Sequence, residues 1–273
     1  MLQNIKKITK YVLTFPQVAL HKLKGVDHSY SELVDFFRYF PFSSINNDNS
    51  VNIRFHGKKL KFFYGPQGPV TAGEFASFDY EFLNVKDKVV IDVGAAIGDT
   101  AIIFKLKGAK KVFAFDINKR YLQIAKKNIE VNGLCEDIEF ILSSVAGKEI
   151  NKDDEILGAI MLDKDREALN VIKNISLEEI IRKYKLRDPI LKIDVDGYEY
   201  EILETSSANT LNKFDSICLE YHYGLKKIPQ ILQNAGFEYS VIPTNQVVID
   251  YHPDKYKNMD IGIINAKRVT KFA

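Results

Sequence analysis

The feature that most constrains the fold is a regular alternation of short apolar runs with helix-like segments, which begins near residue 88. The run Val89–Ile91 is continuously apolar, which is the pattern of a strand buried on both faces of a parallel sheet. A glycine turn follows, then a helix-like segment over 101–106 and a second apolar run over 111–115. This spacing is typical of βαβ units. The sequence therefore predicts an α/β, Rossmann-like fold with parallel strands and helices on both faces of the sheet.

The alternation continues toward the C-terminus. Asn118 is expected to cap a helix that runs to Glu130, and Ser176 with Glu179 three residues later forms a capping box at the start of another helix. Further strands are predicted at 138–142, 190–195, 216–221, 237–242 and either 246–250 or 261–264. We expect one of the last strands to be an antiparallel seventh strand of the sheet.

The residues ahead of this region have a different sequence pattern. Residues 1–80 are predicted to form a small N-terminal α+β cap or lid, and residues 81–273 the α/β domain. Within the cap, the segments 51–55 and 60–64 flank a short polar turn, which indicates a β-hairpin. The polar run 43–50 that precedes the hairpin is typical of a turn or linker.

The composition argues against several classes of protein. The 38 basic and 36 acidic residues among 273 leave a net charge of +2, which disfavours a dedicated nucleic-acid binder. Two cysteines, Cys135 and Cys218, are too few for a disulfide scaffold or a four-ligand zinc site. The apolar segment 11–20 is half as long as a membrane-spanning helix, which needs about 20 residues. We expect a cytoplasmic protein without a transmembrane segment, and a peripheral membrane contact stays an open alternative.

The first chemical motif is the turn after the first strand. Gly94 permits a tight turn, and Gly98 lets the following helix pack close to the strand. The segment does not fit the dinucleotide pattern G-x-G-x-x-G, because Ala96 and Asp99 stand at two of the glycine positions. It fits the D-x-G-x-A/G-x-G loop that binds S-adenosylmethionine, whose carboxylate suits the amides of a helix N-terminus. Asp92 would suit the amino group and the sulfonium of that cofactor. The alternative is a glycine turn that only shapes the corner between strand and helix.

A second element supports the same cofactor. Asp116 ends the second strand about 20 residues beyond the glycine turn, the spacing of an acid that accepts hydrogen bonds from ribose hydroxyls. Ile117 would lie against the adenine, and Ser143 or Ser144 would lie near the same ring. A nicotinamide dinucleotide is the alternative ligand for this acid.

A third element combines two charged residues on one strand. Lys192 and Asp194 share a face of an otherwise apolar strand, because side chains alternate along a strand. Burying charges costs several kcal/mol each unless they are paired, so their presence in such a strand indicates a function. Asp194 stands at the carboxyl end of the strand, where open α/β sheets bind ligands. A purely structural pair of the two residues is the alternative.

These motifs together resemble the FkbM family of S-adenosylmethionine-dependent methyltransferases. The similarity runs from about residue 70 to 225 and includes 92–100, 115–118, Asn128, Asn132–Gly133 and 192–199. Ala96 stands where family members often carry Asn, and Asp196 where Glu is common. The resemblance implies a seven-stranded methyltransferase fold, S-adenosylmethionine as the cofactor, and methylation of a hydroxyl, often on a sugar or a natural-product skeleton.

The predicted function is therefore O-methylation of a hydroxyl on a sugar, a glycolipid or a small natural-product-like acceptor. The predicted cofactor contacts are Asp92, Gly94, Ala95, Gly98, Asp116, Ile117, Ser143 and Ser144, and Glu74 is a further candidate for the amino group. Two other functions stay open. One is a tRNA methyltransferase, although the sequence carries neither a D/N-P-P-Y/R signature nor a catalytic cysteine pair. The other is a non-catalytic binding protein on a methyltransferase fold.

A fourth group of polar residues follows the strand at 216–221. Glu220 and His222 alternate with apolar residues, so they share a face near Asp194. His222 could be a structural hydrogen-bonding residue, a base that takes the proton of the acceptor hydroxyl, or a ligand of a divalent ion together with the two acids. The sequence does not separate these roles. We predict Lys192 and Asp194 as catalytic residues, His222 as a second base, and assign no metal ligand.

Overall fold

The computed structural model describes residues 43–65, 82–145, 172–243 and 259–269, together with 16–20 and the single positions 22, 33, 36, 37, 40 and 80. The candidate strand at 246–250 and the candidate cofactor contact Glu74 lie outside the described residues.

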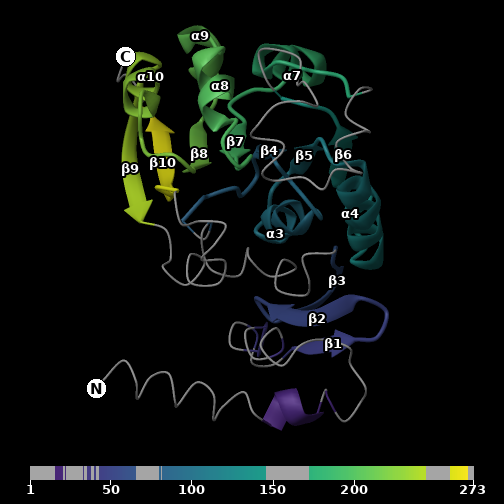
Figure 1. Ribbon diagram of the computed structural model, residues 1–273. Coiled ribbons are helices and arrows are strands. Elements are labelled where there is room, and N and C mark those ends of the chain that lie inside the picture. The colour runs from purple at the N-terminus through teal and green to yellow at the C-terminus, as the bar shows by residue number, and fades with distance from the viewer. Residues whose placement is uncertain are drawn as a thin grey trace, which may run out of the picture.

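The centre of the structure is a seven-stranded sheet with the strand order β6-β5-β4-β7-β8-β10-β9 (Figure 1). Its strands are β4 Val89–Val93, β5 Lys111–Asp116, β6 Ile138–Leu142, β7 Ile190–Ile193, β8 Ser216–Tyr221, β9 Phe237–Pro243 and β10 Gly262–Arg268. The pairs from β6 to β8 are parallel, whereas β10 pairs antiparallel with both β8 and β9. The predicted α/β, Rossmann-like fold with an antiparallel strand is confirmed, and the segment 261–264 supplies that strand.

The helices begin where the sequence places their caps. The described helices are α3 Asp99–Leu106, α4 Lys119–Val131, α7 Leu177–Tyr184, α8 Glu199–Glu204, α9 Ala208–Leu211 and α10 Ile228–Asn234. The Asn118 side chain accepts hydrogen bonds from two backbone amides in the first turn of α4. Ser176 and Glu179 form the predicted capping box at the start of α7. These local side-chain contacts satisfy amides that the helix itself leaves unpaired.

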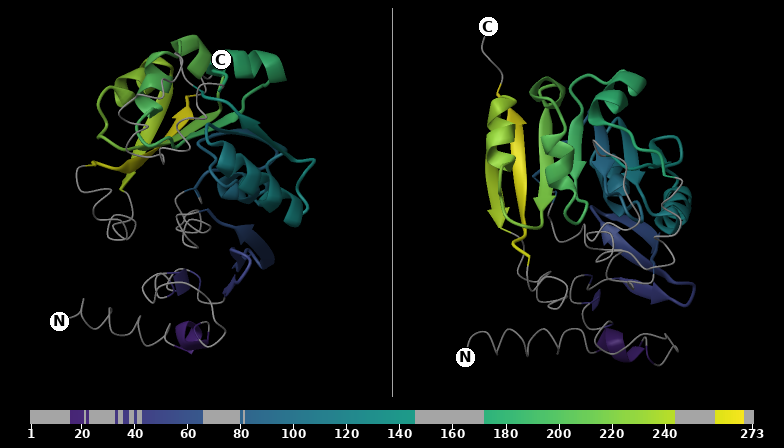
Figure 2. Two further views of the ribbon diagram at one scale, coloured as in Figure 1. Left: turned by 45° about the vertical axis from the view of Figure 1, so that its right-hand side comes forward. Right: turned by 45° about the horizontal axis from the view of Figure 1, so that its top comes forward.

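The sheet is covered on both faces, as Figure 2 shows from two sides. Along β4, Val90 packs into a hydrophobic cluster with α3 and α4, whereas its neighbour Ile91 packs into a second cluster with α7, α8, α9 and α10. This alternation along a strand buries both faces of the sheet. By the same alternation Lys192 and Asp92 belong to the α3 face, beside the glycine turn.

The N-terminal part contains a three-stranded antiparallel sheet of β1 Ser44–Asn46, β2 Ser50–Phe55 and β3 Lys58–Phe63. The hairpin predicted at 51–55 and 60–64 is confirmed. The interpretation of 43–50 as a turn or linker is wrong in its first half, because β1 pairs with β2. Ile45 is buried there, and polar side chains bridge the two strands, with Asn52 Nδ2 donating to Ser44 Oγ at 3.0 Å.

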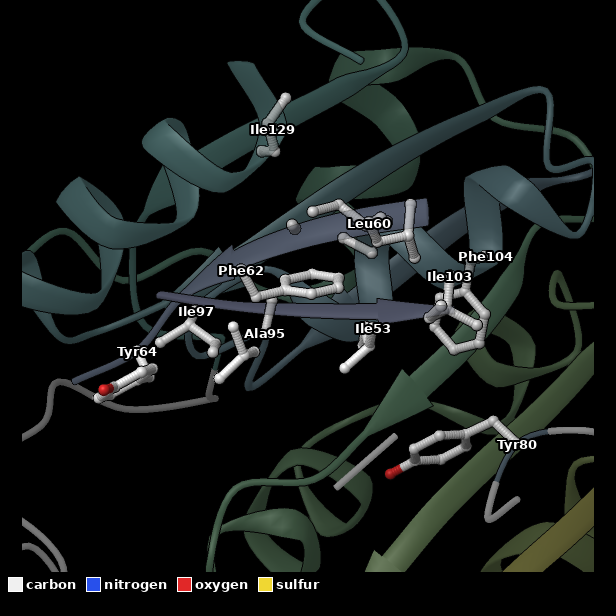
Figure 3. Packing of buried hydrophobic residues seen from close by; sticks show 14 of the residues in the cluster. Ile53, Leu60, Phe62, Tyr64, Tyr80, Ala95, Ile97, Ile103, Phe104 and Ile129 are labelled. Carbon is white, nitrogen blue, oxygen red and sulfur yellow. The ribbon is translucent and has the colours of Figure 1, made fainter. Parts of the chain in front are cut away.

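The hairpin is joined to the α/β part by hydrogen bonds and by a common core. Asn128 of α4 accepts from the Phe63 amide at 2.6 Å and donates to the Phe63 carbonyl at 3.0 Å and to Ile97 O at 2.9 Å. Figure 3 shows Leu60 and Phe62 of β3 beside residues of the glycine turn and α3 in this core. The division of the chain at residue 80 stays a prediction.

Candidate active site

The glycine turn holds the ends of three strands together. Gly94 has φ +78°, and a Cβ there would lie 1.7 Å from the backbone oxygen of Asp194, the residue that follows β7. The amides of Gly94 and Ala95 both donate to Phe115 O of β5, at 2.9 and 3.0 Å. A glycine is needed at position 94 because the backbones of the β4 and β7 ends approach so closely.

The start of α3 offers a place for an anionic group. Gly98 is the N-cap and has no side chain to cap the helix, whereas the Asp99 carboxyl accepts from the amides of Asp99 and Thr100 in the first turn. The N-terminus of a helix favours a carboxylate or phosphate. Burial raises the pKa of Asp99 in this first turn to about 7, and the charge of Lys192 partly opposes that effect. The turn therefore fits the carboxylate end of S-adenosylmethionine.

Asp116 is the last residue of β5 and Ile117 follows it, and both are half-buried. The Asp116 carboxylate accepts from Ala96 N at 2.8 Å and from Asn118 N at 2.7 Å. Burial raises the pKa of Asp116 to about 6, although these two amides oppose it. Each carboxylate oxygen can accept a second hydrogen bond, so Asp116 retains the capacity to bind ribose hydroxyls.

Ser143 and Ser144 follow β6 and are buried. The Ser143 hydroxyl donates to Lys173 O at 2.7 Å, and its amide donates to Asp116 O. The Ser144 hydroxyl has no hydrogen-bond partner within the described part of the chain. A buried hydroxyl without a partner is costly, and a ligand that supplied one would remove that cost. This group fits the predicted contact to the adenine.

Lys192 lies at the centre of a buried charge cluster. It faces Asp92 in the parallel register of β4 and β7, and its Nζ lies 3.1 Å from Asp92 Oδ1 and 2.9 Å from Gly94 O. Burial alone would lower the pKa of Lys192, but the carboxylates of Asp92 and Asp194 outweigh it and raise the pKa above its ordinary value. The Thr100 hydroxyl donates to Asp92 Oδ2 at 2.6 Å. Lys192 thus bridges the glycine turn and Asp194.

This arrangement changes the interpretation of Asp92. The sequence pairs Lys192 with Asp194 and assigns Asp92 to the cofactor, but Asp92 is the closer partner of Lys192 and its side chain is fully buried. Its contact to the cofactor stays a prediction, while its contact to Lys192 is part of the structure.

Asp194 is a partly exposed carboxylate of this region, with 33% of its side chain exposed. One oxygen, Oδ2, lies 3.7 Å from Lys192 Nζ and 3.4 Å from the Tyr80 hydroxyl, whereas Oδ1 lies 4.0 Å from His222 Nε2. Tyr80 packs on Phe104 of α3 with ring centroids 5.9 Å apart. Sequence reasoning missed Tyr80, because nothing in its local pattern indicates a contact with a residue so distant in the chain.

His222 is buried and held by Glu199, the first residue of α8. Glu199 Oε1 accepts from the His222 amide at 2.9 Å and lies 3.3 Å from His222 Nδ1. On the other side of the ring, Nε2 lies 3.5 Å from Asp196 Oδ1. Glu199 is also missing from the sequence-based site, although an acid after Gly197 at the start of a helix was a signal for it.

The charges around His222 determine its protonation. Burial alone would lower the pKa of His222, but the hydrogen bond to Glu199 and the charges of the neighbouring carboxylates raise it to about 9. At pH 7 the ring therefore carries a proton on both nitrogens. The predicted role of His222 as a base requires that proton to leave first.

Comparison with known proteins identifies the family. The family described as "Methyltransferase FkbM domain" matches residues 92–239, just over half of the chain. The chain belongs to the FkbM methyltransferase domain family. The match includes the glycine turn, Asp116, Lys192, Asp194 and His222. It confirms the resemblance seen in the sequence and the prediction of S-adenosylmethionine as the cofactor.

Curated relatives of this FkbM-domain protein match it over shorter segments. A ribosomal protein L11 methyltransferase of Acinetobacter baumannii (strain AYE) is 43% identical over 53 residues, which cover 19% of this chain and 18% of the relative. An uncharacterized protein 158B of Sulfolobus islandicus rod-shaped virus 1 is 32% identical over 108 residues, covering 40% of this chain and 63% of the relative. The chain thus spans less than two thirds of the length of these relatives.

Solved structures are similar at low sequence identity. Precorrin-6y C5,15-methyltransferase from Geobacter metallireducens GS-15 is 17% identical with a TM-score of 0.41, covering 71% of this chain and 87% of that one. TrmK of M. capricolum, in complex with S-adenosyl-homocysteine, is 16% identical with a TM-score of 0.46, covering 70% and 66%. Among the helices of the described residues, none has the length and the apolar composition that a bilayer-spanning helix requires.

Proposed function

We propose that this FkbM-domain chain is an S-adenosylmethionine-dependent O-methyltransferase that acts on a hydroxyl of a sugar, a glycolipid or a small natural-product-like acceptor. The observation that carries the proposal is the position of Asp194. Its half-exposed carboxylate lies between Lys192 and His222, and its backbone, directly after β7, lies against the glycine turn. The acceptor class and the cytoplasmic location are parts of the proposal.

Four groups of this chain would hold the cofactor. The N-terminus of α3 suits its carboxylate, Asp116 the ribose hydroxyls, Ile117 the face of the adenine, and the Ser144 hydroxyl its edge. When bound, S-adenosylmethionine supplies a methyl carbon on a sulfonium, and its transfer to a hydroxyl oxygen breaks the carbon–sulfur bond and leaves neutral S-adenosylhomocysteine. Positioning the two reacting atoms can supply several kcal/mol of the rate enhancement.

The chain's main chemical task is to remove the proton of the acceptor hydroxyl. Asp194 is an acceptor-side carboxylate with solvent access, and that proton would pass to its Oδ2. Lys192 places a positive charge 3.7 Å from this oxygen, and the Tyr80 hydroxyl lies 3.4 Å from it. Proton removal by a placed base contributes about 10²–10⁴-fold to the rate. Protonated His222 would attract the other carboxylate oxygen of Asp194, Oδ1, and would not compete for the proton of the hydroxyl.

The test of the acceptor class is methyl transfer from tritiated S-adenosylmethionine into separated RNA, glycan, lipid and small-molecule fractions. Label in glycan, lipid or small molecules, stable to mild base as an ether is, supports the proposal. Label in RNA would favour the tRNA alternative and overturn the acceptor class. Binding of S-adenosylhomocysteine without transfer to any fraction would indicate a non-catalytic protein.

The test of the residue assignment is Asp194→Asn. We expect turnover to fall at least tenfold, within the range of a lost base, while affinity for S-adenosylhomocysteine changes only a few-fold. Asp215→Asn is the matched control, because Asp215 is 32% exposed and pairs with Lys88 at 3.2 Å beside the opposite end of β8. A collapse of cofactor affinity in Asp194→Asn would instead assign Asp194 to the cofactor site.

A further inference from the structure

We propose that Asp194, Glu220 and His222 bind a divalent cation on the acceptor side of the site, an inference that rests on the proposed function. One ligand atom from each of the three residues can be chosen so that all lie within 4.8 Å of one another. Cation–ligand distances of about 2.0–2.6 Å place pairs of ligands about 3–5 Å apart. The three side chains therefore need little movement to meet around one ion.

The sheet itself sets this spacing. In the parallel register of β7 and β8, Ile193 lies opposite Leu219, so that Asp194 and Glu220 come next on the two neighbouring strands. His222 lies two residues beyond Glu220 and so continues the same face. Two adjacent strand ends thus supply the three ligands, and both strands are packed on either side within the main sheet.

Glu199 gives an independent reason to regard His222 as a ligand. Its fully buried carboxylate lies against His222 Nδ1, so Nε2 is the nitrogen that faces Asp194 and Asp196. Histidines that bind metals almost always contact a carboxylate, carbonyl or water through their other nitrogen, which fixes the orientation of the ring. Glu199 is not one of the three proposed ligands. It contacts the other ring nitrogen of His222 and so fixes the orientation of the ring.

The balance of charge favours a cation as well. The carboxylates of Asp194, Asp196 and Glu199 lie within 4.0 Å of the His222 ring, and Glu220 adds a fourth. Lys192 Nζ lies 3.7 Å from Asp194 Oδ2 and 3.1 Å from Oδ1 of the buried Asp92. Carboxylates that lie close together repel one another when both are ionised. A divalent ion would add positive charge where these carboxylates meet.

The donor set indicates the class of ion. One imidazole nitrogen with two carboxylates suits a first-row ion such as Mn²⁺ better than Mg²⁺, which prefers oxygen alone. Three protein ligands leave coordination positions for an acceptor hydroxyl, whose pKa the ion would lower. The ion would take Asp194 Oδ1, and Oδ2 would stay beside Lys192 to receive the proton.

The experiment measures Mn²⁺ binding to the full chain after treatment with a chelator, by calorimetry and by loss of the free Mn²⁺ electron paramagnetic resonance signal. We expect one ion per chain. Glu220→Gln and Asp194→Asn should each weaken binding by about 10–100-fold or more, the range seen when metal-site residues are changed. Asp215→Asn is the control and should bind Mn²⁺ as the wild type does. Because His222 is buried, a loss of Mn²⁺ binding in His222→Gln counts as the loss of a ligand only if Glu220→Gln, at a half-exposed position, also loses binding.

The outcomes separate this inference from the proposed function. Absence of saturable Mn²⁺ binding, or binding that both Glu220→Gln and Asp194→Asn leave unchanged, would overturn the cation site even if methyl transfer to a hydroxyl is observed. Binding of one ion that Glu220→Gln and Asp194→Asn weaken supports the cation site even if no hydroxyl acceptor is methylated. In that case only the proposed function fails. Transfer that a chelator abolishes and Mn²⁺ restores would support both.

Discussion

Removing the buried cation Lys192 is expected to be one of the most costly single changes in this protein. Lys192 is 1% exposed, and its partner Asp92 is fully buried 3.1 Å away. In Lys192→Met the Asp92 carboxylate stays in the core with the Thr100 hydroxyl but without a positive charge. Breaking a buried ion pair from one side typically costs 3–5 kcal/mol. That is a large part of the 5–15 kcal/mol by which domains are usually stable.

A second substitution separates the charge from the loss of shape. In the double variant Lys192→Met, Asp92→Asn the core holds no net charge at this point, and the amide can still accept from Thr100. We therefore expect the double variant to recover at least about 2 kcal/mol, a coupling of the size that double-mutant cycles measure for contacting residues. Lys88→Met tests a half-exposed pair with Asp215 and should cost no more than about 1 kcal/mol.

The assay is urea unfolding followed by far-ultraviolet circular dichroism, with tyrosine fluorescence as the second probe because the chain has no tryptophan. Coincident transitions would justify a free energy of unfolding for each variant. A loss below about 1 kcal/mol in Lys192→Met, or additive effects in the double variant, would refute the reasoning that the pair is held by charge in a dry core. The double variant should remain poorly active, since Lys192 also faces Asp194.

Three further predictions follow from single positions. Gly94→Ala should prevent normal folding, measured by circular dichroism, because its Cβ would lie 1.7 Å from the backbone oxygen of Asp194. Gly57→Ala is the control: its φ is also positive, at +77°, but its Cβ would lie in open space, so it should cost only about 1–2 kcal/mol. The pKa of Asp99 is raised to about 7 in the folded state, whereas in the unfolded chain this carboxyl loses its proton near pH 4. The free energy of unfolding therefore falls as the pH rises from about 4 to about 7. In urea titrations across that range, the free energy of unfolding of Asp99→Asn should decline by up to about 4 kcal/mol less than that of the wild type. Affinity for S-adenosylhomocysteine, measured by calorimetry, should fall below pH 6, where the carboxyl of Asp116 becomes protonated, and Asp116→Asn should abolish that dependence.

The fold could be predicted from the sequence because its signals are local. The strands at 138–142 and 216–221 coincide with their apolar runs, and the caps Asn118 and Ser176 mark the starts of α4 and α7. Strand β1 was missed for the opposite reason. Its polar sequence is typical of a turn, and its pairing depends on the neighbouring strand and on burial of Ile45 against the rest of the core.

The site could be predicted only in part, because its residues are brought together from distant parts of the chain. Spacing within one strand relates Lys192 to Asp194, but the partnership with Asp92 arises from the register of β4 against β7. Tyr80 and Glu199 reach the site from the N-terminal side and from α8. No pattern within a single segment of sequence encodes such contacts.

His222 illustrates how folding changes the chemistry of a residue. Judged by its type, a histidine with a free pKa of about 6.5 is a natural base at neutral pH. Burial alone would lower the pKa of His222, but the fold places Glu199 against its Nδ1 and Asp194 near its Nε2, and these carboxylates together with Glu220 raise the pKa to about 9. A ring that holds two protons cannot accept the proton of a hydroxyl. In the proposed function, the half-exposed Asp194 would then be the better acceptor, and a divalent ion that displaced the proton of Nε2 would turn His222 from a cation into a ligand. The charges gathered at the ends of β7 and β8 would thus decide which residue removes the proton.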